Sequence, residues 1–146
     1  MTTNDTTLSW QGLLTAAAGT TRTATGPAAL ASAGEALRLA WATTGAARAG
    51  SPDGQLWWLR LAEAIAETAD ELELVPGAPL LPLGTGPAPD DAVTDTPASR
   101  AALLGLLTAA RDALARHAGT AQSGAEKLAA TLAADAAARA VTAGSP

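Results

Sequence analysis

Residues Gln55–Leu74, QLWWLRLAEAIAETADELEL, decide the fold of this 146-residue chain. Apolar side chains recur in it at every third or fourth position, as they do on one face of an α-helix. Charged side chains fall on the opposite side. We therefore predict an amphipathic helix and place it at the centre of a small bundle. Its apolar face consists of Trp58, Leu61, Ala62, Ile65, Ala69 and Leu72.

Proline and capping signals divide the rest of the chain into four further helices. We expect helices to begin near Thr7, at Pro27, at Pro97 and after Ser123, with the central helix beginning at Pro52. Each of the three prolines follows a glycine, serine or threonine, and this order is typical of the first turn of a helix.

The fourth and fifth helices each carry an apolar stripe that predicts a buried face. The stripes are Leu103, Leu107, Ala110 and Leu114 in the fourth helix, and Leu128, Leu132 and Ala136 in the fifth. In the fifth helix we also expect a capping box between Ser123 and Glu126. The spacing of Asp135 and Arg139 predicts an ion pair one turn apart.

The prolines of residues 75–96 forbid a regular helix there. We expect a long connection that packs on the bundle through Leu80, Leu81 and Leu83. The predicted fold is therefore all-α, a single bundle of about five helices over residues 1–146 with a long Pro/Gly-rich loop between the third and fourth helices. We expect the tails, residues 1–6 and 144–146, to be frayed.

The composition argues against several classes of function. A net charge of −5 argues against general binding to nucleic acid or to an anionic membrane, because both need a basic face. The lack of cysteine excludes disulfides and thiolate metal sites. We find no signal peptide and no run of about 18 apolar residues. We expect a cytoplasmic protein without a cofactor, and the Ala, Gly, Pro and Arg content is typical of a GC-rich bacterial genome.

The segment Arg111–His117, RDALARH, contains the only histidine of the chain. It resembles the R-(polar)-x4-H signature of HEPN domains, small helical bundles of which many are metal-independent ribonucleases. The resemblance implies that Arg111 stabilises a phosphate, that Asp112 is the polar residue of the signature and that His117 exchanges protons. It also implies an RNA partner and a site shared between two protomers.

A separate argument concerns the positions of Arg111 and His117 on one helix. Six residues place these two side chains roughly 120° apart on a straight helix. They would therefore meet only across a dimer or where the helix breaks. The alternative is that His117 packs at the edge of the bundle and interacts favourably with the helix dipole.

The charged side of Gln55–Leu74 carries the acids Glu63, Glu67, Asp70, Glu71 and Glu73. Glu67 and Asp70 resemble the ExxD half of the all-α nucleotide pyrophosphohydrolases, which implies Mg²⁺-dependent hydrolysis. The matching ExxE is missing from the preceding helix, which offers only Glu35. A solvated helix face therefore accounts better for these acids, and we predict no metal site.

Trp57 and Trp58 lie about 100° apart on a helix, so both cannot face the centre of one stripe. We expect one of them to meet the leucine-rich loop or a second chain, because tryptophan is enriched at interfaces. The predicted interface consists of Trp57, Trp58, Leu80, Leu81 and Leu83. The preferred function is a non-catalytic interaction module that forms a homodimer. The alternatives are a HEPN-type ribonuclease or its inactive relative, and a Mg²⁺-dependent nucleotide pyrophosphohydrolase.

Overall fold

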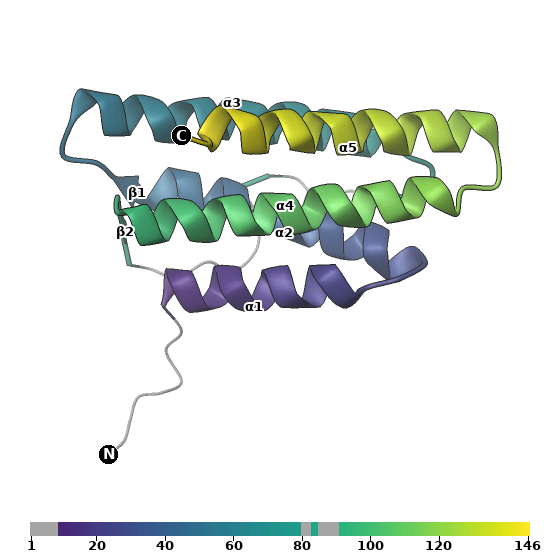
Figure 1. Cartoon of the computed structure of the whole chain (residues 1–146), viewed down its shortest axis with the longest axis horizontal. Coiled ribbons are helices and arrows are strands. Elements are labelled where there is room, and N and C mark those ends of the chain that lie inside the picture. Colours follow the sequence, from purple (N-terminus) through teal and green to yellow (C-terminus); the bar gives the residue numbers. More distant parts are fainter. Residues whose placement is uncertain (1–8, 80–82, 85–90) are drawn as a thin grey trace, which may run out of the picture.

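The computed structural model describes residues 9–79, 83–84 and 91–146 of the chain. These residues contain five helices that pack against one another, so the predicted all-α bundle is confirmed (Figure 1). Two very short strands, β1 and β2, pair in parallel. The elements are α1 (Trp10–Thr23), α2 (Pro27–Ala46), β1 (Ala47–Arg48), α3 (Pro52–Glu73), β2 (Val93–Thr94), α4 (Pro97–Gly119) and α5 (Gly124–Gly144).

Four of the helices form a closed ring. α2 packs on α3 and α4, and α5 packs on the same two helices. The pairs α3/α4 and α2/α5 therefore face each other across the bundle. Neighbouring helices of the ring run antiparallel, whereas α3 and α4 run in the same direction (Figure 1). α1 packs on α2 and α4 from outside the ring.

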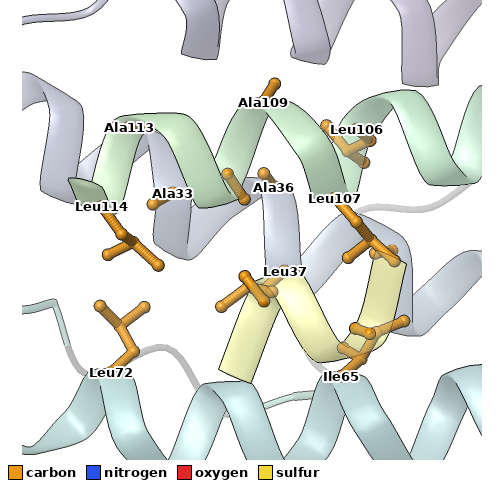
Figure 2. Close-up of a cluster of buried hydrophobic side chains, with 14 of the residues drawn as sticks. Ala33, Ala36, Leu37, Ile65, Leu72, Leu106, Leu107, Ala109, Ala113 and Leu114 are labelled. Atoms are coloured by element: carbon orange, nitrogen blue, oxygen red, sulfur yellow. The ribbon is translucent and has the colours of Figure 1, made fainter. Parts of the chain in front are cut away.

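α4 is the central helix, and our placement of Gln55–Leu74 at the centre was wrong. α4 packs on α1, α2 and α5, whereas α3 packs on α2 and α5. The predicted stripe of α4 is buried, and Figure 2 shows Leu107 and Leu114 pointing toward α3 while Ala109 points the opposite way. A second buried stripe, of Leu106, Ala109 and Ala113, therefore faces α1. Its alanines gave too weak a hydrophobic signal to be recognised in the sequence.

The buried face of α5 is made almost entirely of alanine. Leu128 and Leu132, which we expected to be buried, are 60% and 44% exposed. Alanine has no side chain beyond Cβ, so two helix backbones can approach closely and gain dispersion contacts along their length. This surface packs on α3 and α4. Its residues are Ala130, Ala133, Ala134, Ala136, Ala137 and Ala140.

The starts of three helices follow the predicted caps. The side chains of Ser51, Thr96 and Ser123 each accept a hydrogen bond from a backbone N–H in the first turn of their helix. Thr7 lies outside the described residues, and α1 begins at Trp10. Its N-cap is Ser9, whose hydroxyl accepts a hydrogen bond from the N–H of Gly12.

Two polar contacts predicted for α5 are wrong in their partners. Glu126 accepts a hydrogen bond from the N–H of Gln122 at 3.4 Å, so the capping box with Ser123 is only half formed. Arg139 pairs with Glu67 of α3 at 3.2 Å and not with Asp135. The Glu126 contact is local, because Gln122 lies four residues earlier in the chain, whereas the contact of Arg139 depends on the tertiary packing of α5 on α3.

The long connection between α3 and α4 is a consequence of their common direction. α3 has 22 residues and is therefore about 33 Å long. The chain must return over this length before α4 begins, which needs at least about 10 extended residues. The returning chain is held where Trp10 donates a hydrogen bond to the carbonyl of Asp91 and where β2 pairs with β1.

A leucine at Ala137 is expected to destabilise the bundle. Ala137 is fully buried in the alanine face of α5. Additional methylene groups there would force the helices apart, which typically costs about 1–3 kcal/mol. Thermal unfolding followed by circular dichroism should show a lower Tm for Ala137→Leu. The matched control is Leu128→Ala, which should change stability by less than about 0.5 kcal/mol because Leu128 is exposed. The opposite order of the two variants would contradict this account of α5.

Candidate functional site

A polar cluster joins the N-terminal parts of α3 and α4 to the last residue of α5. We call it the Arg100 corner, and it consists of Asp95, Arg100, Trp57 and Gly144. Asp95 directly follows β2, and its N–H donates a hydrogen bond to the carbonyl of Arg48 in β1 at 3.1 Å. The parallel β pair therefore sets the position of Asp95 beside the start of α3.

Asp95 and Arg100 form a bidentate ion pair. Arg100 Nε lies 2.7 Å from Asp95 Oδ1, and Nη2 lies 2.9 Å from Oδ2. The side chain of Asp95 is only 14% exposed, and that of Arg100 is 34% exposed. Two parallel charge-assisted hydrogen bonds fix both the position and the plane of the guanidinium.

The pKa of Asp95 is lowered from its ordinary value. The main cause is the pair of hydrogen bonds donated by Arg100, and the charge of Arg100 adds to them. Burial acts in the opposite direction, because it disfavours the charged carboxylate. The indole N–H of Trp58 also lowers the pKa of Asp95. This N–H makes no hydrogen bond to any described residue, so it acts on the Asp95 carboxylate as a nearby dipole.

Trp57 covers one face of the Arg100 guanidinium. The ring centroid lies 4.7 Å from Arg100 Cζ, which is a cation–π contact. Its indole N–H donates a hydrogen bond to the carbonyl of Gly144 at 3.1 Å. The ring also meets Trp58 edge to face, with centroids 4.8 Å apart. Trp57 thus connects α3, α4 and α5 through one side chain.

Two glycines allow this close approach. A Cβ at Gly54 would lie 2.6 Å from Asp95 Oδ2, and a Cβ at Gly144 would lie 2.6 Å from Leu104 Cδ2. Neither distance is compatible with a normal contact, so a Cβ at either position would force the side chain of Asp95 or Leu104 to shift. Gly144, which we expected in a frayed tail, is instead the buried last residue of α5.

A hollow of about 550 Å³ lies beside the Arg100 corner. Small-molecule sites in proteins typically have volumes of about 300–1,000 Å³ and apolar walls with few polar groups. This hollow has the same character, because apolar side chains form much of its lining and Arg100 supplies a positive charge. The lining consists of Trp57, Asp95, Thr96, Pro97, Arg100, Ala101, Leu104 and residues 144–146.

The residues of the HEPN-like motif make two separate contacts, each with a nearby acidic side chain. Arg111 Nε lies 3.0 Å from Asp112 Oδ1, and both side chains are more than a third exposed. His117 Nε2 lies 3.6 Å from Glu126 Oε1 of α5, and its side chain is 12% exposed. Both ring nitrogens of His117 are buried without a hydrogen-bond partner in the described part of the chain. The structure therefore brings Arg111 to Asp112 and His117 to Glu126.

Arg116, which lies between them, has a role that the sequence analysis missed. Its Nη2 donates hydrogen bonds to the carbonyls of Thr21 at 2.8 Å and Ala24 at 3.1 Å, at the end of α1. It thereby satisfies carbonyls that a helix end leaves without partners. The signal was present, because Arg116 continues the spacing of Ala109 and Ala113, which face α1.

The acids of α3 remain on a solvated face. Glu63, Glu67, Asp70 and Glu73 are exposed, and Glu67 pairs with Arg139. Over residues 9–79, 83–84 and 91–146, no group of three or more His, Cys, Asp or Glu side chains could hold a metal ion. The Mg²⁺-dependent hydrolase therefore stays an untested alternative without a recognisable site in this part of the chain.

Among the described residues of the predicted interface, Trp57 and Trp58 are in contact, whereas Leu83 lies at the other end of α3. Trp58 is in the core with 4% of its surface exposed, and Trp57 is half-buried in the Arg100 corner. Leu83 is half-buried near Leu72, at the opposite end of α3, where it lines a hollow of about 250 Å³. Leu80 and Leu81 lie outside the described residues.

Comparison with known proteins gives no relative from which a function could be transferred. No protein-family model, curated protein or solved structure matches this chain. No helix in the described ranges is long and apolar enough to cross a membrane.

Replacing Asp95 by asparagine should destabilise the protein in a pH-dependent way. The variant loses the charge-assisted pair with Arg100, and we expect a loss of about 1–2 kcal/mol at pH 7. Because the folded-state pKa of Asp95 lies below the unfolded value of about 3.9, the pair stabilises the fold above that pH. Its contribution disappears as the pH falls through the lowered pKa. Urea unfolding of wild type and Asp95→Asn at pH 7 and at acidic pH measures both effects.

Asp112→Asn is the matched control for this series. Asp112 also pairs with an arginine, but its side chain is 49% exposed. Exposed pairs contribute about 0–1 kcal/mol, so this change should have little effect at either pH. Equal losses in the two variants would show that Asp95 has no special structural role.

The HEPN resemblance can be tested by RNA cleavage in the presence of a metal chelator. We expect no cleavage that depends on His117, because its ring nitrogens are buried away from any substrate. Wild type and His117→Ala should therefore give the same background. Cleavage by wild type that is lost in both His117→Ala and Arg111→Ala would instead establish the ribonuclease function.

Proposed function

We propose that this protein is a non-catalytic interaction module that self-associates through the outer face of α3 and α5. One observation carries the proposal. All five exposed large hydrophobic side chains of the described residues belong to these two neighbouring helices or to the cap of α3. They are Leu56, Leu59, Leu74, Leu128 and Leu132, and we call them the exposed leucines.

The distribution of these leucines differs from that of an ordinary surface. Single exposed apolar residues are normal on a soluble protein, but they are usually scattered. In the described chain, α1, α2 and α4 expose no large hydrophobic side chain. The two helices that do expose them pack side by side and antiparallel (Figure 1). The exposed leucines therefore lie on two adjacent helices, and Leu59 also borders a hollow that is lined by Trp41 and Thr44 of α2.

The size of the outer face of α3 and α5 suits a dimer of the chain with itself. A helix of 22 residues is about 33 Å long, and two adjacent helices are about 20 Å wide. This face therefore covers about 660 Å², to be compared with roughly 800 Å² per partner in a standard interface. Side chains at its edges would supply the difference.

The charges of this face favour a second copy of the chain as the partner. Glu63, Glu67 and Asp70 are exposed on α3, and Lys127 and Arg139 are exposed on α5. Because a two-fold axis places the same face on both partners, a face that carries both signs can pair with itself. The mechanism is then burial of leucine surface with charge pairing at the rim, and no chemical step is involved.

Leu132→Glu is expected to weaken self-association. Burial of a leucine contributes about 1.5–3 kcal/mol, and in a two-fold dimer each substitution occurs twice. We therefore expect the dimer dissociation constant to rise at least about tenfold. Sedimentation velocity over a range of protein concentrations measures this change. Leu132 is 44% exposed, so the fold should be retained, which circular dichroism checks.

The control is Ala16→Glu, which adds the same charge to the exposed side of α1, outside the proposed face. It should leave the dimer unchanged. The proposal fails if wild type stays monomeric at every concentration, or if Ala16→Glu weakens the dimer as strongly as Leu132→Glu does.

A further inference from the structure

The guanidinium of Arg100 has one edge that the Arg100 corner does not use. A guanidinium carries five N–H donors in a rigid plane, and Asp95 accepts from Nε and from one N–H of Nη2. The other three donors have no hydrogen-bond partner among the described residues. Two of them, one on Nη1 and one on Nη2, form a second fork at the far end of the group.

This unused fork is already held in a fixed orientation. Asp95 fixes the plane of the guanidinium, and Trp57 covers one of its faces at 4.7 Å. The side chain nevertheless remains 34% exposed and lines the hollow of about 550 Å³. A donor pair held in place before binding loses little conformational freedom when a ligand arrives, and this favours affinity.

We propose that the hollow beside Arg100 binds a small organic carboxylate with an apolar body. The second fork of the guanidinium matches the two oxygens of a carboxylate, which Arg binds through two parallel hydrogen bonds. The apolar body would lie against Trp57, Ala101 and Leu104, which also line the hollow. This site is independent of the outer face of α3 and α5 proposed for self-association.

The charges of the site tolerate one anionic ligand. Asp95 is negative, but Arg100 lies between it and the second fork. The first turn of α4, at Thr96 and Pro97, also lines the hollow and carries the partial positive charge of a helix N-terminus. The partial negative charge at the end of α5 is reduced, because the Gly144 carbonyl already accepts the N–H of Trp57.

Titration with phenylacetate, followed by the indole N–H signals in ¹H–¹⁵N NMR, tests the proposal. Trp57→Phe identifies the signal of Trp57 among the four tryptophans. We expect phenylacetate to shift this signal in a saturable way. Phenylacetamide, which has the same shape without the charge, should bind at least about tenfold more weakly.

Two variants test separately how the guanidinium and the hollow contribute to binding. Arg100→Lys keeps the positive charge but loses the fork, so binding of phenylacetate should weaken at least about tenfold. Ala101→Phe fills the hollow from an exposed position and leaves the Asp95–Arg100 pair in place, so binding should be lost while Tm is retained. A signal that phenylacetate does not shift, equal binding of acid and amide, or unchanged binding by Ala101→Phe would each overturn the proposal.

Discussion

The common direction of α3 and α4 is the constraint on which the rest of this structure depends. Because the two helices lie across the bundle and run the same way, the chain must travel the whole length of α3 a second time. This return explains why a bundle of this size has a long Pro-rich connection. It also brings residues 91–96 beside the end of α2, where the parallel β pair forms. Asp95 is placed between the starts of α3 and α4 as a direct result.

The interior of the bundle combines two kinds of packing. Leucines of α4 fill the centre of the bundle and point toward α3. The buried face of α5, in contrast, consists of alanines. Alanine buries little apolar area, so the free energy of this contact depends on close approach along the full helix length. Because alanines form the buried face of α5, the leucines of this helix lie outside the core. Their exposure is therefore linked to the way in which α5 packs.

Much of the fold could be predicted from the sequence, because prolines and caps mark where helices begin. Pro27, Pro52 and Pro97 all occupy the first position of a helix. The buried face of α5 could not be predicted, because alanine is found as readily on the surface of a helix as inside it. The pairing of Arg139 with Glu67 depends on which helices are neighbours, and no local spacing contains that information.

The candidate site was harder to predict than the fold. Asp95, Arg100 and Gly144 are distant from Trp57 in the sequence, and none of them belongs to a recognisable motif. The adjacent positions of Trp57 and Trp58 did indicate that one of the two side chains lies outside the main apolar stripe of the helix. The structure shows that Trp57 contacts Arg100 and Gly144. The RDALARH segment drew attention to His117, whereas its neighbour Arg116 makes the contacts with α1.

The position of α1 outside the ring has a consequence for local unfolding. Helices α2 to α5 close on themselves, so α1 can separate without opening the ring. It is held by one packed side, by the hydrogen bonds from Arg116 and by the contact of Trp10 with Asp91. Proteins open in cooperative units whose free energies differ. We therefore expect α1 to open at a lower free energy than the ring, which would uncover Ala109 and Ala113 of α4 while the remaining four helices stay folded.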